Sequence, residues 1–249
     1  MKTAVVLSGG GAKGSYQLGV WKALRELHIK YDIVTGTSIG AINGVLMCEK
    51  SYFKAKRIWH KLNLEYLFNE LPKSNKDIDI LKLFGGNFIK NGGMDIKKIE
   101  TIIEKNVNKR KFYNSKIDFG LITYNFTTKK PLILSKNKIP SDKLTDYLMA
   151  SATCFPAFKM KEIDGDKYID GGYYDNLPIE LAIKLGAEFL IIVDLGSPGF
   201  KKRPSKNIDS ILIKPKNNIS FFLNFDEKIA RINAKFGYND TLKAFKKLD

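Results

Sequence analysis

The chain has 249 residues, of which 44% are hydrophobic and 27% are charged. These values are typical of a soluble globular protein with one large core, and no apolar run approaches the ~18 residues of a membrane span. The formal net charge of +16 favours anionic partners, although a lysine-rich proteome would give the same excess. Because no basic stretch has the interleaved aromatic residues of a nucleic-acid module, we expect no nucleic-acid partner.

The two cysteines, Cys48 and Cys154, both lie in apolar contexts and provide no disulfide framework. The N-terminal apolar run is too short for a signal peptide and is better explained as a strand. We therefore expect a reduced, cytoplasmic protein, with peripheral contact to an anionic membrane as an additional hypothesis.

The first 35 residues predict a βαβ unit. Residues 3–7 form an uninterrupted apolar run, typical of a strand buried on both faces. The loop Gly9-x-Gly11-x-x-Gly14 follows, and apolar residues then recur at helical spacing from Ser15 to His28. Residues 31–35 form the second predicted strand. The usual handedness of such a unit places both strands in a parallel sheet covered by helices.

The rest of the chain alternates predicted helices with strands and shows no internal repeat or low-complexity linker. Residues 71–93 predict a mobile insertion around a short apolar helix, as either a solvated connection or a lid. We expect helices over residues 39–48, 54–67, 95–107, 141–152 and from 178 onward, with helical segments to the end of the chain. We expect strands over residues 117–126 and 131–135, 158–163 and 167–169 (two hairpins), 189–194 and 211–213.

The turn Gly36-Thr37-Ser38-Ile39-Gly40 lies between the second strand and a helix of small residues. A Gly-x-Ser-x-Gly turn at such a junction forces the serine into strained backbone geometry, so that its hydroxyl projects from the end of the strand. The flanking glycines are needed because a Cβ would collide with the neighbouring strand or helix. The five-residue pattern recurs by chance, so its weight depends on partner motifs.

The glycine loop after the first strand allows three interpretations. A P-loop would need the lysine directly after the last glycine, whereas Lys13 precedes that glycine. A dinucleotide-binding turn fits the glycine spacing but lacks an acidic residue at the end of the next strand. An oxyanion hole would use the unobstructed amides of the glycines. Since this loop and Ser38 follow neighbouring parallel strands, they lie at the same edge of the sheet, which favours the oxyanion hole.

A serine nucleophile needs a base, and the chain offers few candidates. His28 ends a predicted helix and His60 lies in a charged helix, so neither faces the serine turn. Asp170 ends an apolar strand and precedes two glycines. Spacing alone favours an ordinary Asp-Gly turn there over a catalytic role.

Three motifs in this order, residues 9–14, 36–40 and 170–172, resemble the signatures of the patatin-like phospholipases. Residues 150–158 also resemble the stretch that precedes the aspartate in that family, and the likeness runs from residue 3 to about residue 195. It implies an α/β fold, a three-layer α/β/α sandwich with a mixed, mostly parallel central sheet. We expect one domain, with the catalytic part over residues 1–215 and residues 216–249 as a C-terminal helical segment packed on it, although the resemblance assigns no feature to the chain after residue 204.

The resemblance further implies a lipid acyl hydrolase of the phospholipase A or lysophospholipase type, which cleaves carboxylic esters of phospholipids or other acyl lipids through an acyl-enzyme. Ser38 would be the nucleophile and Asp170 the second member of a Ser-Asp dyad. No metal or cofactor is expected, because the nucleophile is a side chain and the sequence has no ligand cluster. The oxyanion hole would come from Gly9, Gly10, Gly11, Gly14 and Ile39, and the motif glycines would be Gly36, Gly40, Gly171 and Gly172.

Two other classes of protein stay open at this point. A dinucleotide-binding oxidoreductase would explain the glycine loop but neither Ser38 nor Asp170. A non-catalytic basic protein on anionic membranes would explain the charge and leave the three motifs to coincidence. The sequence gives no information on the oligomeric state.

Overall fold

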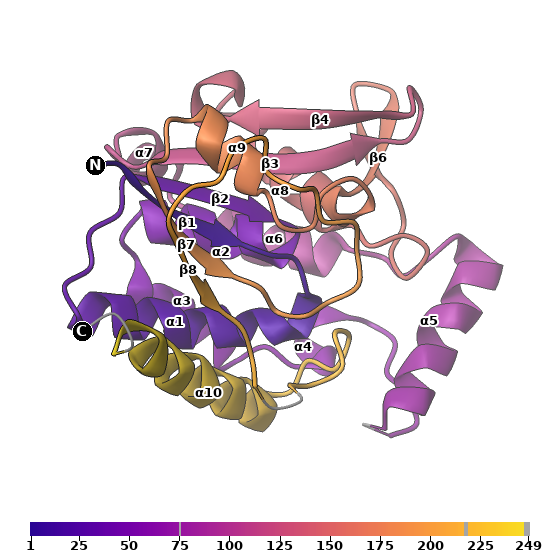
Figure 1. Cartoon of the computed structure of the whole chain (residues 1–249). Helices are drawn as coiled ribbons and strands as arrows, with labels where there is room; N and C mark the ends of the chain where they lie inside the picture. Colours follow the sequence, from indigo (N-terminus) through magenta and orange to yellow (C-terminus); the bar gives the residue numbers. More distant parts are fainter. Residues whose placement is uncertain (75, 217–218, 247–249) are drawn as a thin grey trace.

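A mixed sheet of eight strands forms the middle layer of the computed structural model, which describes residues 1–74, 76–216 and 219–246 (Figure 1). Hydrogen-bonded neighbours follow the path β5-β6-β3-β2-β1-β7-β8, and β4 also pairs with β3. The strands are β1 (Thr3–Leu7), β2 (Ile33–Thr37), β3 (Asp118–Asn125), β4 (Lys130–Ser135), β5 (Lys161–Ile163), β6 (Asp166–Asp170), β7 (Phe189–Val193) and β8 (Ser210–Ile213).

The strands β3, β2, β1, β7 and β8 run parallel to one another, whereas β4, β6 and β5 pair antiparallel. The parallel strands are apolar runs, as expected where helices cover both faces. The helix α9 (Ile179–Lys184) contacts β1, β2 and β3 on one face, while α1 (Ser15–Glu26) and α2 (Ile39–Cys48) lie on the other. The predicted three-layer α/β/α sandwich with a mixed, mostly parallel sheet is confirmed.

The strand β3 aligns the ends of two other strands. Its Ile122 pairs with Thr37, the last residue of β2, and the next residue, Thr123, pairs with Asp170, the last residue of β6. Because β4 pairs along residues 120–125 of β3 and a strand has only two edges, β2 and β6 share the other edge of β3. The two strands therefore meet end to end, which brings the residues that follow Thr37 next to Asp170.

Most predicted helices are present, with different bounds. The helix expected over residues 54–67 is two short helices, and the helix at residues 109–113 was not predicted. The remaining helices are α3 (Tyr52–Trp59), α4 (Leu64–Leu67), α5 (Asp77–Asn91), α6 (Lys97–Asn106), α7 (Lys109–Tyr113), α8 (Leu144–Ala152) and α10 (Glu227–Phe245), with 3-10 turns at Gly11–Gly14, Lys136–Lys138 and Gly171–Tyr173. None of the helices in the described ranges is long and apolar enough to cross a membrane.

The segment over residues 71–93 differs most from its prediction, because it contains a regular helix of 15 residues rather than a short one. Gly85 and Gly86 lie inside this helix, where each glycine costs about 1 kcal/mol relative to alanine, so the sequence pattern indicated an interruption. The helix ends at Gly92, whose φ of +71° is the left-handed conformation that glycine favours after a helix. Figure 1 shows α5 at the margin of the molecule, away from the sheet.

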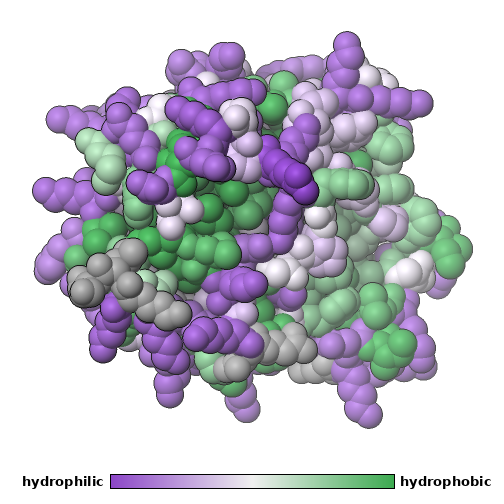
Figure 2. Space-filling model, viewed as in Figure 1, coloured by the Kyte–Doolittle hydropathy of each residue, from purple (hydrophilic) through white to green (hydrophobic). Residues whose placement is uncertain are grey.

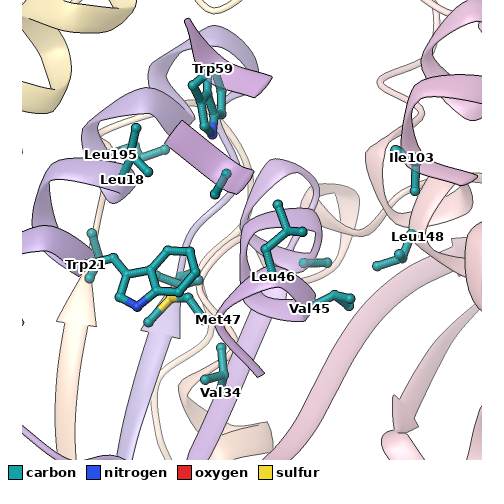
Figure 3. Packing of buried hydrophobic residues seen from close by; sticks show 14 of the residues in the cluster. Leu18, Trp21, Val34, Val45, Leu46, Met47, Trp59, Ile103, Leu148 and Leu195 are labelled. Carbon is teal, nitrogen blue, oxygen red and sulfur yellow. The ribbon is translucent and has the colours of Figure 1, made fainter. Parts of the chain in front are cut away.

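The main hydrophobic core lies between the sheet and the layer that contains α1, α2 and α3. Figure 3 shows members of this core, among them Trp21 of α1, Met47 of α2 and Trp59 of α3. A smaller core on the opposite face packs under α9. Outside the cores, hydrophilic side chains cover much of the face shown in Figure 2.

The helices α1 and α10 cross at two glycines. A Cβ at Gly19 would lie 1.8 Å from the Ala234 carbonyl oxygen, and a Cβ at Gly237 would lie 2.0 Å from the Tyr16 carbonyl oxygen. Only glycine allows the two backbones to approach so closely. Thus α10 packs on the helix of the first βαβ unit, while the division of the chain at residue 215 stays a prediction.

This crossing leads to a prediction about stability. Gly237→Ala should lower the free energy of unfolding by about 1–3 kcal/mol or more, because the added methyl group meets backbone that cannot move aside. The control is Gly85→Ala in α5, where no atom lies within 4 Å of the added Cβ, and it should raise stability by up to about 1 kcal/mol. Urea unfolding measures both, and equal effects would contradict the packing described here.

Candidate active site

Ser38 lies at the junction of β2 and α2 with strained backbone angles, φ 56° and ψ −130°. A non-glycine residue rarely adopts a positive φ, and such strain is typical of functional sites. The turn is as tight as the sequence predicts: a Cβ at Gly36 would lie 2.4 Å from Gly40 backbone atoms, and a Cβ at Gly40 would lie 2.4 Å from the Leu7 carbonyl oxygen. Glycine is therefore required at both motif positions.

A buried serine of α8 holds this turn in place. The Ser38 amide donates a hydrogen bond of 2.9 Å to Ser151 Oγ, and Ser151 Oγ in turn donates one of 2.7 Å to the Ile122 carbonyl oxygen. Ser151 thus links the strained turn to β3 at the residue that pairs with the end of β2. In the sequence, residues 150–158 contribute only to a resemblance, and Ser151 has no predicted role.

Asp170 is buried at the end of β6, and its Oδ1 accepts a 2.8 Å hydrogen bond from the Gly172 amide. A Cβ at Gly171 would lie 2.1 Å from the Ile122 carbonyl oxygen, so glycine is needed for the chain to pass β3. Asp170 and Ser38 line the same cavity. The structure therefore brings the two expected catalytic residues together, 132 residues apart in the chain.

Burial is the main reason why Asp170 is a weaker acid than an ordinary aspartate. It raises the pKa of the carboxyl group to about 6, whereas the Ser38 hydroxyl and the Gly172 amide favour the charged form and act in the opposite direction. A carboxylate with a pKa near 6 is charged at neutral pH and is a better proton acceptor than an ordinary aspartate. The position can therefore accept a proton from Ser38.

The glycine loop lies on the other side of Ser38. Gly10 and Gly11 line the cavity that contains Ser38. Gly10 caps a 3-10 helix and Gly11 is its first residue, and the first N–H groups of a helix have no partner inside it. Gly11 has a φ of +54°, and a Cβ there would lie 2.2 Å from the Phe222 carbonyl oxygen. Ile39 is the first residue of α2, so its amide also lies at a helix N-terminus.

Two of the five expected oxyanion donors do not fit that role. The Gly9 amide donates to Asn176, to both its side-chain and its main-chain oxygen at 3.1 Å, and is thus already engaged. Gly14 does not line the cavity; a Cβ there would collide with Ile39 and Trp59, so this glycine is needed for packing. The candidate donors are therefore Gly10, Gly11 and Ile39.

A chain of side-chain amides fixes the loop against α2 and α3. Asn43 Nδ2 donates to the Gly14 carbonyl oxygen and to Gln17 Oε1, and Gln17 Nε2 donates to the Ser8 carbonyl oxygen. Trp59 Nε1 completes the chain by donating to Asn43 Oδ1 at 3.0 Å. All three side chains are buried, so the loop is held rigidly.

The cavity in front of Ser38 has a volume of about 460 Å³. Its walls are mostly apolar or aromatic, and the polar side chains that line it are those of Ser38, Asp170, Tyr173, Asn176 and Ser197. Cys154 lines it too, but burial raises the pKa of that thiol to about 12, so it is not a reactive thiolate. Neither His28 nor His60 lines this cavity.

A second, smaller cavity of about 100 Å³ begins at the same serine. It shares Gly11, Ser38 and Phe158 with the first cavity and extends between α2, α3 and α6. Its lining is almost entirely apolar, with Ile42, Leu46, Ile58, Leu62, Ile99, Ile102 and Ile103 among the residues. Ser38 is thus accessible from two chambers.

The described residues hold neither a cluster of metal ligands nor the acidic side chain that a dinucleotide-binding fold would need. Within residues 1–74, 76–216 and 219–246, no group of three or more His, Cys, Asp or Glu side chains could hold a metal ion. The end of β2, where a dinucleotide-binding fold would need an acidic side chain, carries Thr37 and Ser38 instead.

Comparison with protein families agrees with this fold and these motifs. The model of the family described as patatin-like phospholipase matches residues 5–183, and the chain belongs to this family. The match includes the glycine loop, the serine turn and Asp170.

Relatives by sequence are much longer proteins. Patatin-like phospholipase domain-containing protein 7 of Mus musculus is 31% identical over 205 residues, which is 78% of this chain and 14% of that protein. The corresponding protein 6 of Homo sapiens is 32% identical over 208 residues, covering 78% and 13%. Lysophospholipase nte1 of Aspergillus terreus is 31% identical, covering 78% and 12%. The chain thus spans at most 14% of the length of these relatives.

Solved structures share the fold at low identity. VipD from Legionella pneumophila aligns with 99% of this chain and 67% of its own, with a TM-score of 0.54 and 15% identity. The type III effector protein ExoU aligns with 98% of this chain and 52% of its own, with a TM-score of 0.54 and 14% identity. These likenesses support the fold described above.

The buried carboxyl group leads to a prediction about stability. Because the folded chain holds the Asp170 proton more tightly than the unfolded chain, this group makes wild-type stability fall as the pH rises from about 4 to about 6. Asp170→Asn removes this contribution and should be more stable than the wild type by about 1–3 kcal/mol above pH 6. Urea unfolding at several pH values measures the difference, and a variant less stable at pH 8 would contradict the assigned cause.

Proposed function

We propose that this chain is a lipid acyl hydrolase of the phospholipase A or lysophospholipase type, with Ser38 and Asp170 as a catalytic dyad. The observation that carries the proposal is a strained serine beside a buried carboxylate whose pKa is raised to about 6. The family to which the chain belongs supports the reaction class, and a relative named as a lysophospholipase supports the substrate class.

The reaction would proceed in two halves. Ser38 Oγ attacks the ester carbonyl carbon while its proton passes to Asp170, and the tetrahedral oxyanion accepts hydrogen bonds from the amides of Gly10, Gly11 and Ile39. Collapse breaks the ester bond, and Asp170 returns the proton to the departing alcohol, leaving an acyl group on Ser38. Water then attacks the acyl-enzyme, its proton passes through Asp170 to Ser38, and the fatty acid leaves.

The two chambers that meet at Ser38 suit a lipid ester. The smaller apolar chamber between α2, α3 and α6 would take the acyl chain next to the scissile carbonyl. The larger chamber, which opens near Tyr173 and Phe200, would take the rest of the lipid. Burying apolar chains against such walls favours binding by about 0.8 kcal/mol for each CH₂ group, so affinity should rise with acyl-chain length until the smaller chamber is full.

The dyad can be tested with four variants and a soluble short-chain ester. Ser38→Ala and Asp170→Asn should each lower kcat by several orders of magnitude, because one removes the nucleophile and the other the proton acceptor. His28→Ala and His60→Ala should stay within a few-fold of the wild type, since neither side chain lines the cavity. A folded but inactive histidine variant, together with an active Asp170→Asn, would contradict the dyad.

The pH dependence of turnover tests the same assignment independently. Asp170 accepts a proton only when charged, so kcat/KM should fall about tenfold for each pH unit below about 6 and level off above it. A half-maximal point near pH 4 would show that the group in action is an ordinary exposed carboxylate. A rate that follows no titration between pH 4 and 8 would exclude Asp170 as the base.

A further inference from the structure

The helix α5 has one face that anchors it to the rest of the chain. Ile80 and Phe84 are buried, and the Phe84 ring packs edge-on against Phe68 and Phe158 at centroid distances of 5.4 and 5.7 Å. Phe158 also lines both cavities at Ser38. One face of α5 is therefore fixed directly behind the wall of the site.

A second apolar face of α5 is largely exposed to solvent. At about 100° per residue, the face beside the anchored one carries Ile78, Leu81, Phe88 and Ile89, which are 55%, 47%, 41% and 85% exposed. We call these four residues the α5 stripe. Figure 2 shows hydrophobic residues gathered on the margin where Figure 1 places α5. An exposed apolar patch of this kind marks an interaction surface.

The α5 stripe continues through aromatic side chains to the cavity that contains Ser38. The Phe88 ring contacts that of Phe155 at 5.5 Å, and Phe155 lies 6.2 Å from the half-exposed ring of Phe126. The Tyr173 hydroxyl donates a hydrogen bond to the Phe155 carbonyl oxygen. Tyr173 lines the cavity, so the apolar surface extends from the helix to the cavity.

The loop after β7 adds an aromatic residue and positive charge at the same cavity. Phe200 lines the cavity and is 69% exposed, and the next three residues are Lys201, Lys202 and Arg203. Residues 196–206 contain no acidic residue. Lys201 pairs with Asp194 and Lys202 lies over the Tyr174 ring. Exposed aromatic and aliphatic side chains with neighbouring cations are typical of a surface that lies in the lipid headgroup region.

We propose that the α5 stripe, with Phe126, Tyr173 and Phe200, docks onto an anionic phospholipid bilayer and presents the Ser38 cavity to it. The inference rests on the proposed function and identifies the surface that such an enzyme would use. Two arguments select a bilayer over a second copy of this chain: the apolar surface is continuous with the candidate lipid site, and two molecules with a charge of +16 repel each other.

Vesicle binding tests the proposal separately from catalysis, because it can be measured in a Ser38→Ala background. The test variant is Leu81→Ser with Ile89→Ser. The matched control is Leu212→Ser with Ile232→Ser, on β8 and α10, where the side chains are 52% and 51% exposed. Co-sedimentation is measured with vesicles of phosphatidylcholine alone and of phosphatidylcholine with phosphatidylglycerol.

The Ser38→Ala protein should bind the mixed vesicles more tightly than vesicles of phosphatidylcholine alone. The α5 double variant should bind the mixed vesicles at least ~10-fold more weakly, because two apolar side chains no longer enter the bilayer. The control should stay within about twofold. With Ser38 restored, the α5 variant should lose hydrolysis of vesicle lipid and keep that of a soluble short-chain ester.

A second probe gains a signal instead of losing one. Ile89→Trp places an indole at a position that is 85% exposed, whereas both native tryptophans, Trp21 and Trp59, are buried. Its fluorescence should shift to shorter wavelength when mixed vesicles are added, and that of Leu212→Trp should not shift.

Four results would overturn the docking surface. The first is vesicle binding by the α5 double variant that equals that of the Ser38→Ala protein, and the second is an equal loss of hydrolysis on soluble and vesicle substrates. The third is equal binding of the Ser38→Ala protein to both vesicle types. The fourth is a dimer that forms without lipid and is lost in the α5 double variant. The last would assign the surface to a second copy. Failure of the proposed function would give a different result. A Ser38→Ala protein that still hydrolyses the soluble ester would contradict the dyad, whereas its binding to vesicles would still support the docking surface.

Discussion

The end-to-end meeting of β2 and β6 along one edge of β3 is the constraint on which the site depends. Thr37 and Asp170 pair with the consecutive residues Ile122 and Thr123, so the serine turn and the carboxyl group are adjacent by register. Ser151 ties the turn to the same point of β3. A slip of one residue in this pairing would turn every side chain of the slipped strand to the other face and separate Ser38 from Asp170.

This geometry is maintained against local preferences. Ser38 is held at a positive φ, and Asp170 is charged at neutral pH although burial disfavours that form. Both features cost stability, and the raised pKa makes Asp170 a better proton acceptor than an ordinary aspartate. The surrounding contacts over-determine the site: the amide chain through Asn43 fixes the glycine loop, and Asn176 fixes its first residue.

The parts of the site that the sequence predicted are those encoded locally. Gly36 and Gly40 lie within two residues of Ser38, so their spacing indicates the turn, and the first βαβ unit follows from periodicity. Asp170 was ambiguous because its partner lies on another strand. Ser151 and Asn176 received no role because their contacts span 113 and 167 residues. Gly9 and Gly14 share the motif with Gly10 and Gly11, and only long-range hydrogen bonds and packing separate their roles.

The direct measurement of the central claim is the rate at which a fluorophosphonate modifies Ser38, followed across pH by the mass of the labelled peptide. We expect modification at Ser38 alone, a rate that rises through a pKa of about 6, and loss of both rate and titration in Asp170→Asn. Labelling at another residue, or an Asp170→Asn protein that reacts at the wild-type rate with the same pH profile, would contradict it.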